Sequence, residues 1–265
     1  MSRSALPAIL VLATALAGCA EGGVPDVNLF SIQDDKDLGA ELAAEIAAHP
    51  KDYGTILDPA EYPDAYGHLN RIRDEILATG EVEYAKQFDW ETHLIHDDEV
   101  LNAFAAPGGY IYVYTGLLRY LDQEDHFAGV LGHEIAHAAN RHSTEQMTQQ
   151  YGVATLLGVV LGDPGLVGEI AAGLVGLEFS REDETQADEY SVYYLCETDY
   201  AADGTAGFFE KLESESGGYE IPEFLSTHPS SESRVQDIRT LARSEGCSTE
   251  PNPNAQWTAF TQSLP

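Results

Sequence analysis

The feature that most constrains this chain is the pentapeptide His133-Glu134-Ile135-Ala136-His137, which lies within the strongest helical pattern of the sequence. Apolar residues recur there at helical spacing, so we predict one long helix from Asp122 to Gln150. Positions i and i+4 share one helical face, so the two imidazoles can bind one zinc ion while the glutamate points at a metal-bound water. The alternative is a helix that carries two surface histidines.

Small residues surround this pentapeptide. They are Gly129, Gly132, Ala136, Ala138 and Ala139. Such side chains let other backbone approach the helix closely. This composition favours a metal site over two surface histidines.

A catalytic zinc ion needs a third protein ligand and one open position for water. A third histidine six residues after His137 is excluded, because the chain has Asn140 and Ser143 where that motif has glycine and histidine. A second helix, Ser180 to Cys196, offers Glu184 and Asp188 one turn apart. Glu184 could bind the metal while Asp188 accepts the free N–H of a zinc histidine. Spacing alone does not reject three other acidic residues as ligands, namely Glu182, Asp183 and Glu189.

The rest of the chain alternates between helical and strand patterns. We predict helices over 34–49, 59–79, 201–214 and 230–243. Residues 83–96 have β-type composition, and strands over 102–105 and 110–114 flank the turn Pro107-Gly108-Gly109. These strands are predicted to be neighbours in a small sheet. The segment 248–265 is predicted to lie across the surface of the domain as a strap.

The segment from Tyr151 to Phe179 is the most apolar part of the chain after the first 18 residues. Asp163-Pro164 breaks it and Glu169 adds a charge, so its pieces are shorter than a membrane span. Two short buried or lid-like helices are the simpler interpretation. The alternative is an element that contacts a membrane or a partner.

The N-terminus is typical of a secretory signal. Arg3 precedes a short apolar run, and Leu16-Ala17-Gly18-Cys19 resembles the bacterial lipobox, in which the cysteine is lipidated. An ordinary cleaved signal with a free cysteine is the alternative. Ala20 follows the cysteine at the position where lipoproteins retained in the inner membrane usually have aspartate. The resemblance therefore implies that the lipoprotein lies on the periplasmic side of the outer membrane. We therefore divide the chain into a signal peptide (1–18), a lipidated tether (19–34), one domain (35–247) and a tail (248–265).

Two cysteines remain once Cys19 carries lipid. In an oxidising compartment, Cys196 and Cys247 are predicted to form a disulfide that ties the C-terminal region to a central helix. Two separate buried thiols are the alternative.

The charge of the chain excludes one class of partner. Its 45 acidic and 13 basic residues give a formal net charge of -32. Such a chain repels phosphate backbones, so we expect no nucleic-acid partner.

Beyond the pentapeptide, several short motifs follow one another in a recognisable order. They are Asn102-Ala-Phe-Ala, Pro107-Gly-Gly-Tyr-Ile-Tyr-Val, Thr115-Gly-Leu-Leu, Leu131-Gly-His-Glu-Ile-Ala-His, Ser180-Arg, Ala187-Asp and Thr227-His-Pro with Arg234. Over residues 35–243 this order resembles the HtpX-like, CAAX-prenyl-protease-related zinc metallopeptidases, and most closely their periplasmic branch of soluble lipoproteins and quality-control proteases.

The resemblance implies roles for particular residues. It makes His133, His137 and Glu184 the ligands of one zinc ion. It makes Glu134 the catalytic base and Asp188 the carboxylate that accepts the free N–H of a zinc histidine. Asn102 lies on the strand that binds extended substrate. His228 and Arg234 lie near the zinc and could stabilise the oxyanion, and in some relatives the equivalent of His228 fills the open metal position and keeps the enzyme latent. The other histidines, at 49, 68, 93, 96, 126 and 142, are expected to be structural.

The resemblance also implies a fold and a function. The expected fold is α+β, a mostly helical zincin-like core with a small β-sheet over the metal-binding helix. The expected function is that of a lipid-anchored zinc metalloendopeptidase that degrades unfolded or misassembled envelope proteins. The outer-membrane assembly machinery is a possible partner, and the membrane is contacted through the lipid. The rival function is a chaperone-like assembly factor for outer-membrane proteins with a latent zinc site.

Overall fold

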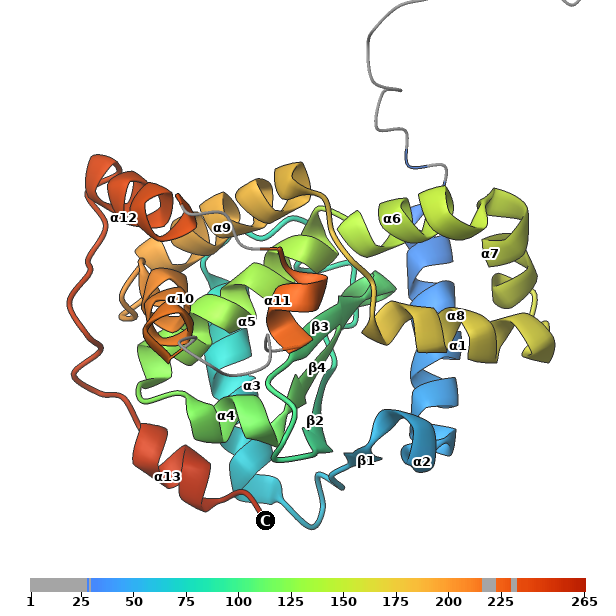
Figure 1. Ribbon diagram of the computed structural model, residues 1–265, viewed down its shortest axis with the longest axis horizontal. Helices are drawn as coiled ribbons and strands as arrows, with labels where there is room; N and C mark the ends of the chain where they lie inside the picture. Colours follow the sequence, from blue (N-terminus) through green and yellow to red (C-terminus); the bar gives the residue numbers. More distant parts are fainter. Residues whose placement is uncertain (1–27, 29, 216–222, 230–232) are drawn as a thin grey trace, which may run out of the picture.

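The computed structural model describes residues 28, 30–215, 223–229 and 233–265. The predicted signal peptide and Cys19 lie outside the described residues. The fold is α+β, as expected: helices surround a small mixed sheet of four strands in the order β1-β2-β4-β3. Figure 1 shows α3 and α5 on one side of this sheet and α1, α7 and α8 on the other.

The strands of the sheet are short. They are β1 (Thr55–Ile56), β2 (Thr92–His96), β3 (Ala103–Ala106) and β4 (Tyr110–Tyr114). β2 runs parallel to β4, and β3 pairs with β4 in the antiparallel sense through the short 3-10 turn η1 (Pro107–Gly109). The two predicted strands around this turn are therefore confirmed as neighbours.

Alternation along β4 divides the interior into two cores. Ile111 and Val113 face the core that contains α3 (Pro63–Ala78) and α5 (Glu124–Ala139). Tyr112 and Tyr114 face the second core, which contains α1 (Ile32–Ala48). Successive side chains of a strand point to opposite faces, so one strand supplies both cores.

α5 is the central helix of the molecule, and every residue in it except His126 is buried. It packs against α9 (Arg181–Cys196) and α10 (Gly204–Glu215). A Cβ atom on Gly129 would lie 2.2 Å from the backbone nitrogen of Thr205. The small residues of α5 therefore allow the close helix packing that the sequence predicts.

The prediction of one helix over 122–150 is wrong. α5 ends at Ala139, and α6 (His142–Tyr151) begins after Arg141, whose φ is 64°. The Asn140 side-chain amide donates to the Ala136 carbonyl at 2.8 Å, and the Arg141 guanidinium pairs with the buried Asp35 of α1. A long-range ion pair therefore holds Arg141 in a left-handed conformation that breaks the helix.

The predicted strand region 83–96 is also shorter than expected. Only Thr92–His96 forms a strand, and residues 82–88 form turns. Tyr84 and Trp90 have positive φ angles, 58° and 49°, and the Trp90 indole donates to the Tyr84 carbonyl at 3.2 Å. This side-chain bond stabilises a turn in a sequence whose composition is typical of a strand.

The apolar segment 151–179 forms two short helices that pack on α1, as in the simpler interpretation. They are α7 (Val153–Val160) and α8 (Pro164–Val175), whose buried residues lie in the second core. Among the described residues, no single helix has the length and apolar composition to cross a membrane; only α7 and α8 together meet that test, and they are bent by 114°.

The C-terminal helices lie close to their predicted positions. The helix predicted over 230–243 is α12 (Arg234–Ser244) in the described part of the chain, and residues 230–232 lie outside it. The predicted disulfide between Cys247 and Cys196 of α9 is confirmed. The tail does lie over the body as a strap: α13 (Trp257–Gln262) packs on α3, and Phe260 is fully buried. Three further helices complete the described elements: α2 (Pro50–Tyr53), α4 (Thr115–Tyr120) and α11 (Glu223–Thr227).

Candidate metal centre

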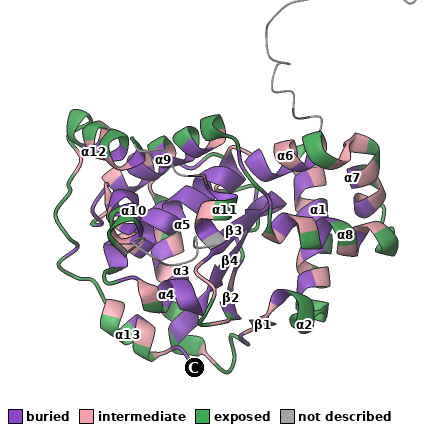
Figure 2. Cartoon of the chain, in the orientation of Figure 1, coloured by how far each residue is buried: buried purple, intermediate pink, exposed green. Residues whose placement is uncertain are grey.

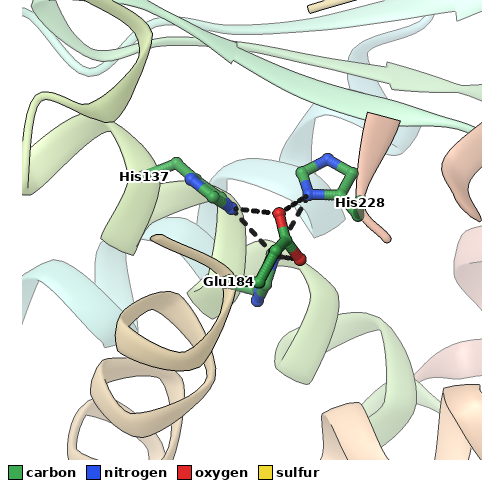
Figure 3. A group of neighbouring side chains, drawn as sticks. His137, Glu184 and His228 are labelled. Atoms are coloured by element: carbon green, nitrogen blue, oxygen red, sulfur yellow. Dashed lines mark hydrogen bonds and ion pairs between the residues drawn. The ribbon is translucent and has the colours of Figure 1, made fainter. Parts of the chain in front are cut away.

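Four side chains from three parts of the chain meet in one buried group. His133 and His137 come from α5, Glu184 from α9 and His228 from the residue after α11, and one ligand atom of each lies within 4.8 Å of all the others. Figure 3 shows His137, Glu184 and His228 pointing at one another. Within the part of the chain that the structure describes, this is the group of histidine and acidic residues that could hold a metal ion.

The distances in this group fit a tetrahedral site. His137 Nε2 lies 3.0 Å from His133 Nε2, which lies 3.3 Å from His228 Nδ1. Glu184 Oε1 lies 2.9 Å from His228 Nδ1 and 3.4 Å from His137 Nε2. Metal–ligand bonds of about 2.0–2.1 Å in a tetrahedron separate the ligand atoms by roughly 3.3 Å. The group therefore has donor types that zinc binds, and these four distances suit a shared metal ion.

The charges of His137 and Glu184 follow from their surroundings. Burial lowers the pKa of His137 well below its ordinary value, so the imidazole is neutral, the form that binds zinc. Burial alone would raise the pKa of Glu184, but the charge of His228 and hydrogen bonds from the histidines hold that pKa well below its usual range. Glu184 is therefore a carboxylate, although its side chain is almost completely buried.

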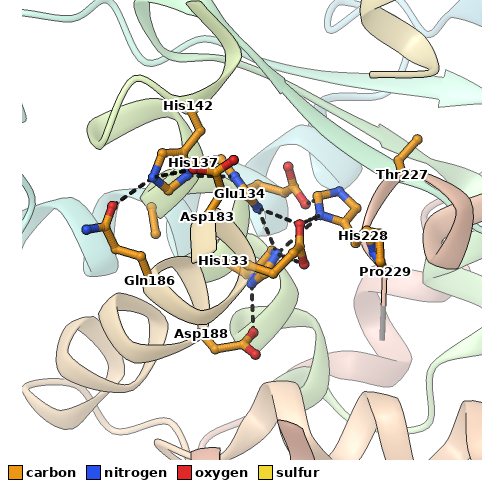
Figure 4. Close-up of polar contacts among 12 residues, drawn as sticks. His133, Glu134, His137, His142, Asp183, Gln186, Asp188, Thr227, His228 and Pro229 are labelled. Carbon is orange, nitrogen blue, oxygen red and sulfur yellow. Dashed lines mark hydrogen bonds and ion pairs between the residues drawn. The ribbon is translucent and has the colours of Figure 1, made fainter. Parts of the chain in front are cut away.

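Asp188 and Arg234 form a second layer behind the ligands. Asp188 Oδ1 lies 3.0 Å from His133 Nδ1. Figure 4 draws this contact as a dashed line. Arg234 donates from Nε and Nη2 to the two Asp188 oxygens, each at 2.7 Å, and its Nη1 lies 2.8 Å from Glu184 Oε2. Burial alone would lower the pKa of His133, but Asp188 and Glu184 outweigh it and raise the pKa to about 9. Arg234 thus contacts two carboxylates of the site.

Glu134 lies beside the ligands without any hydrogen bond to its oxygens from a described side chain. The residue is fully buried, and its Oε1 lies 3.4 Å from His228 Nε2. Burial raises the pKa of Glu134, and nearby His228 and His133 oppose that effect. A buried carboxylate that no side chain hydrogen-bonds is costly, and such groups mark functional sites.

His228 lies between two aromatic rings. Its imidazole stacks on Phe224 at a ring distance of 4.4 Å and on Phe179 at 5.4 Å. Phe179 also stacks on His137 at 4.0 Å, and its backbone N–H donates to the Thr227 carbonyl at 3.1 Å. Phe179 therefore covers the ligands and holds the segment that carries His228.

The three alternative acidic ligands lie outside the group. Glu182 and Glu189 are exposed, and Asp183 accepts the Ser180 N–H as part of the N-terminal cap of α9. The helical phase explains the difference, because Glu184 lies on the buried face of α9 and these residues do not.

Asn102 was expected to lie on a strand. It lies instead directly before β3, which is the edge strand beside α5. It is fully buried, and its Oδ1 accepts the Ala103 N–H at 2.9 Å. Its backbone carbonyl accepts from Tyr114 of β4 at 3.1 Å. Since such bonds alternate along an antiparallel pair, the backbone groups of Ala103 and Ala105 face the other edge.

Sequence reasoning missed His142, which it treated as structural. The helix break turns His142 back toward the site, so that its Nδ1 lies 3.0 Å from His137 Nδ1 (Figure 4). His142 Nε2 lies 2.7 Å from Gln186 Oε1. Residues five apart, such as His137 and His142, do not lie on the same face of a continuous helix. The sequence therefore predicts this contact only when the helix break at Arg141 is already known.

Comparison with known proteins identifies the family. Residues 63–242 match the family described as "Peptidase family M48". The chain belongs to peptidase family M48. The matched range contains all four residues of the ligand group and Glu134.

Several named proteins are similar to this M48 chain. "Mitochondrial metalloendopeptidase OMA1" of Schizosaccharomyces pombe is 29% identical over 216 residues, which cover 80% of this chain and 62% of the relative. "Beta-barrel assembly-enhancing protease" of Yersinia pestis is 33% identical over 203 residues, 71% of this chain and 40% of the relative. "Metalloprotease YcaL" of Escherichia coli is 27% identical over 250 residues, 88% of this chain and 95% of the relative. The chain thus spans less than two thirds of the first two relatives.

Proposed function

We propose that this M48 chain is a zinc-dependent metalloendopeptidase with one zinc ion, held by His133, His137 and Glu184. The observation that carries the proposal is Glu134, a fully buried carboxylate that no described side chain hydrogen-bonds, beside three side chains that could hold a metal ion. Zinc, when bound, supplies a Lewis acid that polarises a carbonyl and makes water a stronger acid. Glu134 takes a proton from the attacking water and passes it to the leaving amine.

Arg234 is assigned as a positioning residue. The resemblance implied that it could stabilise the oxyanion, but its donors point to Asp188, Glu184 and the Pro229 carbonyl. A guanidinium with these partners neutralises two buried carboxylates and fixes their orientation. Asp188 in turn orients the ring of His133 through its Nδ1.

His228 restrains the enzyme in this proposal. Its Nδ1 lies where a fourth ligand of a tetrahedral site belongs, whereas a catalytic zinc site keeps that position open. Phe179 and Phe224 stabilise this arrangement by stacking on the imidazole. Movement of His228 away from the group would open the site to substrate.

Unfolded or misassembled envelope proteins are the proposed substrates. An extended peptide that adds to the edge of β3 beside Asn102 would replace the bonds that the Asn102 amide and the Ser143 hydroxyl make to Ala103 and Ala105. Main-chain hydrogen bonds to the peptide would then give broad sequence preference. Two relatives are named for β-barrel assembly. Their names support outer-membrane proteins as the substrates, and they support the machinery that assembles those proteins as a partner. The lipobox-like sequence at Cys19 supports anchoring on the periplasmic side of that membrane.

One observation favours a second candidate function. The position of His228 among the ligands is also what a chaperone-like assembly factor with a permanently latent zinc site would have. Rescue of outer-membrane protein assembly by Glu134→Gln in a strain that lacks the protein would favour this candidate. Loss of rescue in that variant would favour the peptidase.

The assignment of Glu184 is tested by Glu184→Ala with Glu182→Ala as the matched control on the same helix. Glu184→Ala is expected to lose most of its zinc and its cleavage of casein, because it removes a buried ligand. Glu182→Ala, at an exposed position, is expected to keep both. Zinc content by mass spectrometry and casein cleavage are measured on the same samples. Equal zinc and equal cleavage in the two variants would contradict the assignment.

His142 is expected to strengthen zinc binding through His137. With His137 Nε2 toward the metal, its Nδ1–H donates to His142 Nδ1, and His142 Nε2–H donates to Gln186. Loss of such a partner weakens metal affinity by about 10- to 100-fold, so His142→Phe should lower zinc affinity by that factor. His142→Asn, whose amide oxygen can accept the same proton, should recover part of the loss. Competition with a chelator measures the affinities, and an unchanged affinity in His142→Phe would exclude this role.

A further inference from the structure

The corner between α7 and α8 presents apolar side chains to solvent. Leu161 is 85% exposed and Leu157 is 42% exposed, and they are the exposed large hydrophobic residues in the described parts of the chain. Leu157 lies on α7, and Leu161 follows the helix directly as its C-cap, one turn away. The exposed Ala154 extends this face of α7. Figure 2 shows this corner at the outer end of the molecule, away from α5.

The corner rests on a packed base. Leu156 and Val159 on the opposite face of α7, and Ile170 and Leu174 of α8, are buried in the core shared with α1. The Asp163 side chain accepts the Gly165 N–H at 2.9 Å and caps α8. The two leucines therefore lie on the side of α7 that faces away from this core.

The composition of this corner suits the interface of a neutral bilayer. Between Gly152 and Leu177 the charged residues are Asp163 and Glu169, both exposed, and no basic residue is present. The leucines lie at a bend of 114° between two helices, whereas proteins usually bind peptides in grooves or at sheet edges. Apolar side chains at such a bend enter the headgroup region without crossing the membrane.

The position of the chain's N-terminal part brings a bilayer within reach. Arg141, which precedes α6, donates to the Phe30 carbonyl, and α6 leads directly into α7. The 14 residues from Cys19 to Ile32 are joined by 13 Cα–Cα steps, which can span at most about 45 Å. A lipid on Cys19 would therefore keep the corner close to a membrane, and tethering makes a weak second contact effective.

We propose that the α7–α8 corner is a bilayer-contacting surface, which inserts Leu157 and Leu161 into the lipid–water interface. The proposal rests on the lipid-anchored location in the proposed function, and it does not depend on peptidase activity. It gives the chain a second attachment point, which orients the body on the membrane.

The test uses the chain from Cys19 onward, coupled through the Cys19 thiol to a maleimide-bearing lipid in phosphatidylcholine vesicles. Leu161→Trp places a fluorophore at the corner, and Thr258→Trp places one at an exposed site on α13, at the other end of the molecule. The emission of Leu161→Trp is expected to shift to the blue and to be quenched by lipids brominated on their acyl chains. Thr258→Trp should show neither effect, and adding Leu157→Asp to Leu161→Trp should abolish the quenching.

Three results would overturn the proposal. The first is equal quenching of Leu161→Trp and Thr258→Trp. The second is a blue shift of Leu161→Trp that requires added unfolded casein, which assigns the corner to polypeptide. The third is a shift that requires high protein density on the vesicle, which assigns it to a second copy of the chain. Chemical coupling makes the test independent of natural lipidation, which mass spectrometry of the native protein tests separately, and casein cleavage does not enter the readout.

Discussion

Glu134→Gln is expected to lower casein cleavage by about 10²- to 10⁴-fold, the usual contribution of a general acid–base group. Glutamine has nearly the same shape, but it cannot accept the proton of the attacking water. Because Glu134 is not one of the four ligand residues, the variant should keep its zinc. Cleavage rates and zinc content are measured together on the soluble chain from Ala20 onward, in the otherwise natural sequence and in the His228→Ala background.

The control for this prediction is Glu182→Gln, which makes the same chemical change at an exposed position. It should leave cleavage unchanged. Thermal unfolding of both variants separates a lost proton acceptor from a lost fold. Since Glu134 has no hydrogen-bond partner for its oxygens among the described side chains, its replacement should not destabilise the protein. Cleavage by zinc-loaded Glu134→Gln at the natural rate would exclude Glu134 as the base.

His228→Ala is expected to raise basal casein cleavage by at least about tenfold, which corresponds to about 1.4 kcal/mol of bias toward the closed arrangement. The substitution removes the imidazole whose Nδ1 lies 2.9 Å from Glu184 Oε1 and 3.3 Å from His133 Nε2. The three remaining ligands should still hold zinc, and the fourth position then admits water and substrate.

A second variant separates this restraint from a catalytic role of His228. Phe179→Ala keeps the imidazole but removes the ring that stacks on it and on His137. If His228 closes the site, both variants should cleave casein faster than the natural chain. If His228 instead stabilises the oxyanion, His228→Ala should cleave more slowly, on the order of a hundredfold. A lower rate in His228→Ala with normal zinc content would therefore contradict the restraint.

The central helix was predictable because its signals are local. The spacing of His133 and His137 on one helical face needs no knowledge of the rest of the fold. The glycines of α5 likewise indicate a close packing partner, which the structure identifies as α9 and α10. The turn between β3 and β4 was also readable, because Gly108 and Gly109 adopt the positive φ angles that glycine favours.

The parts that sequence reasoning missed depend on long-range contacts. The helix break before α6 needs Asp35, which is more than a hundred residues away from Arg141 along the chain. The position of His142 beside His137 is a consequence of that break. The choice among Glu182, Asp183 and Glu184 needs the phase of α9 relative to α5, which spacing within α9 does not contain. The family resemblance supplied Glu184 because it carries information about packing that one sequence lacks.

Chelation and return of zinc test the central claim most directly. The His228→Ala chain from Ala20 onward is assayed for casein cleavage as purified, after removal of metal by a chelator, and after addition of one equivalent of zinc. We expect cleavage as purified, none after chelation, and recovery with zinc at one ion per chain. Cleavage that survives complete removal of metal, or a chain that binds zinc without ever cleaving casein, would contradict the assignment of this site as a zinc peptidase.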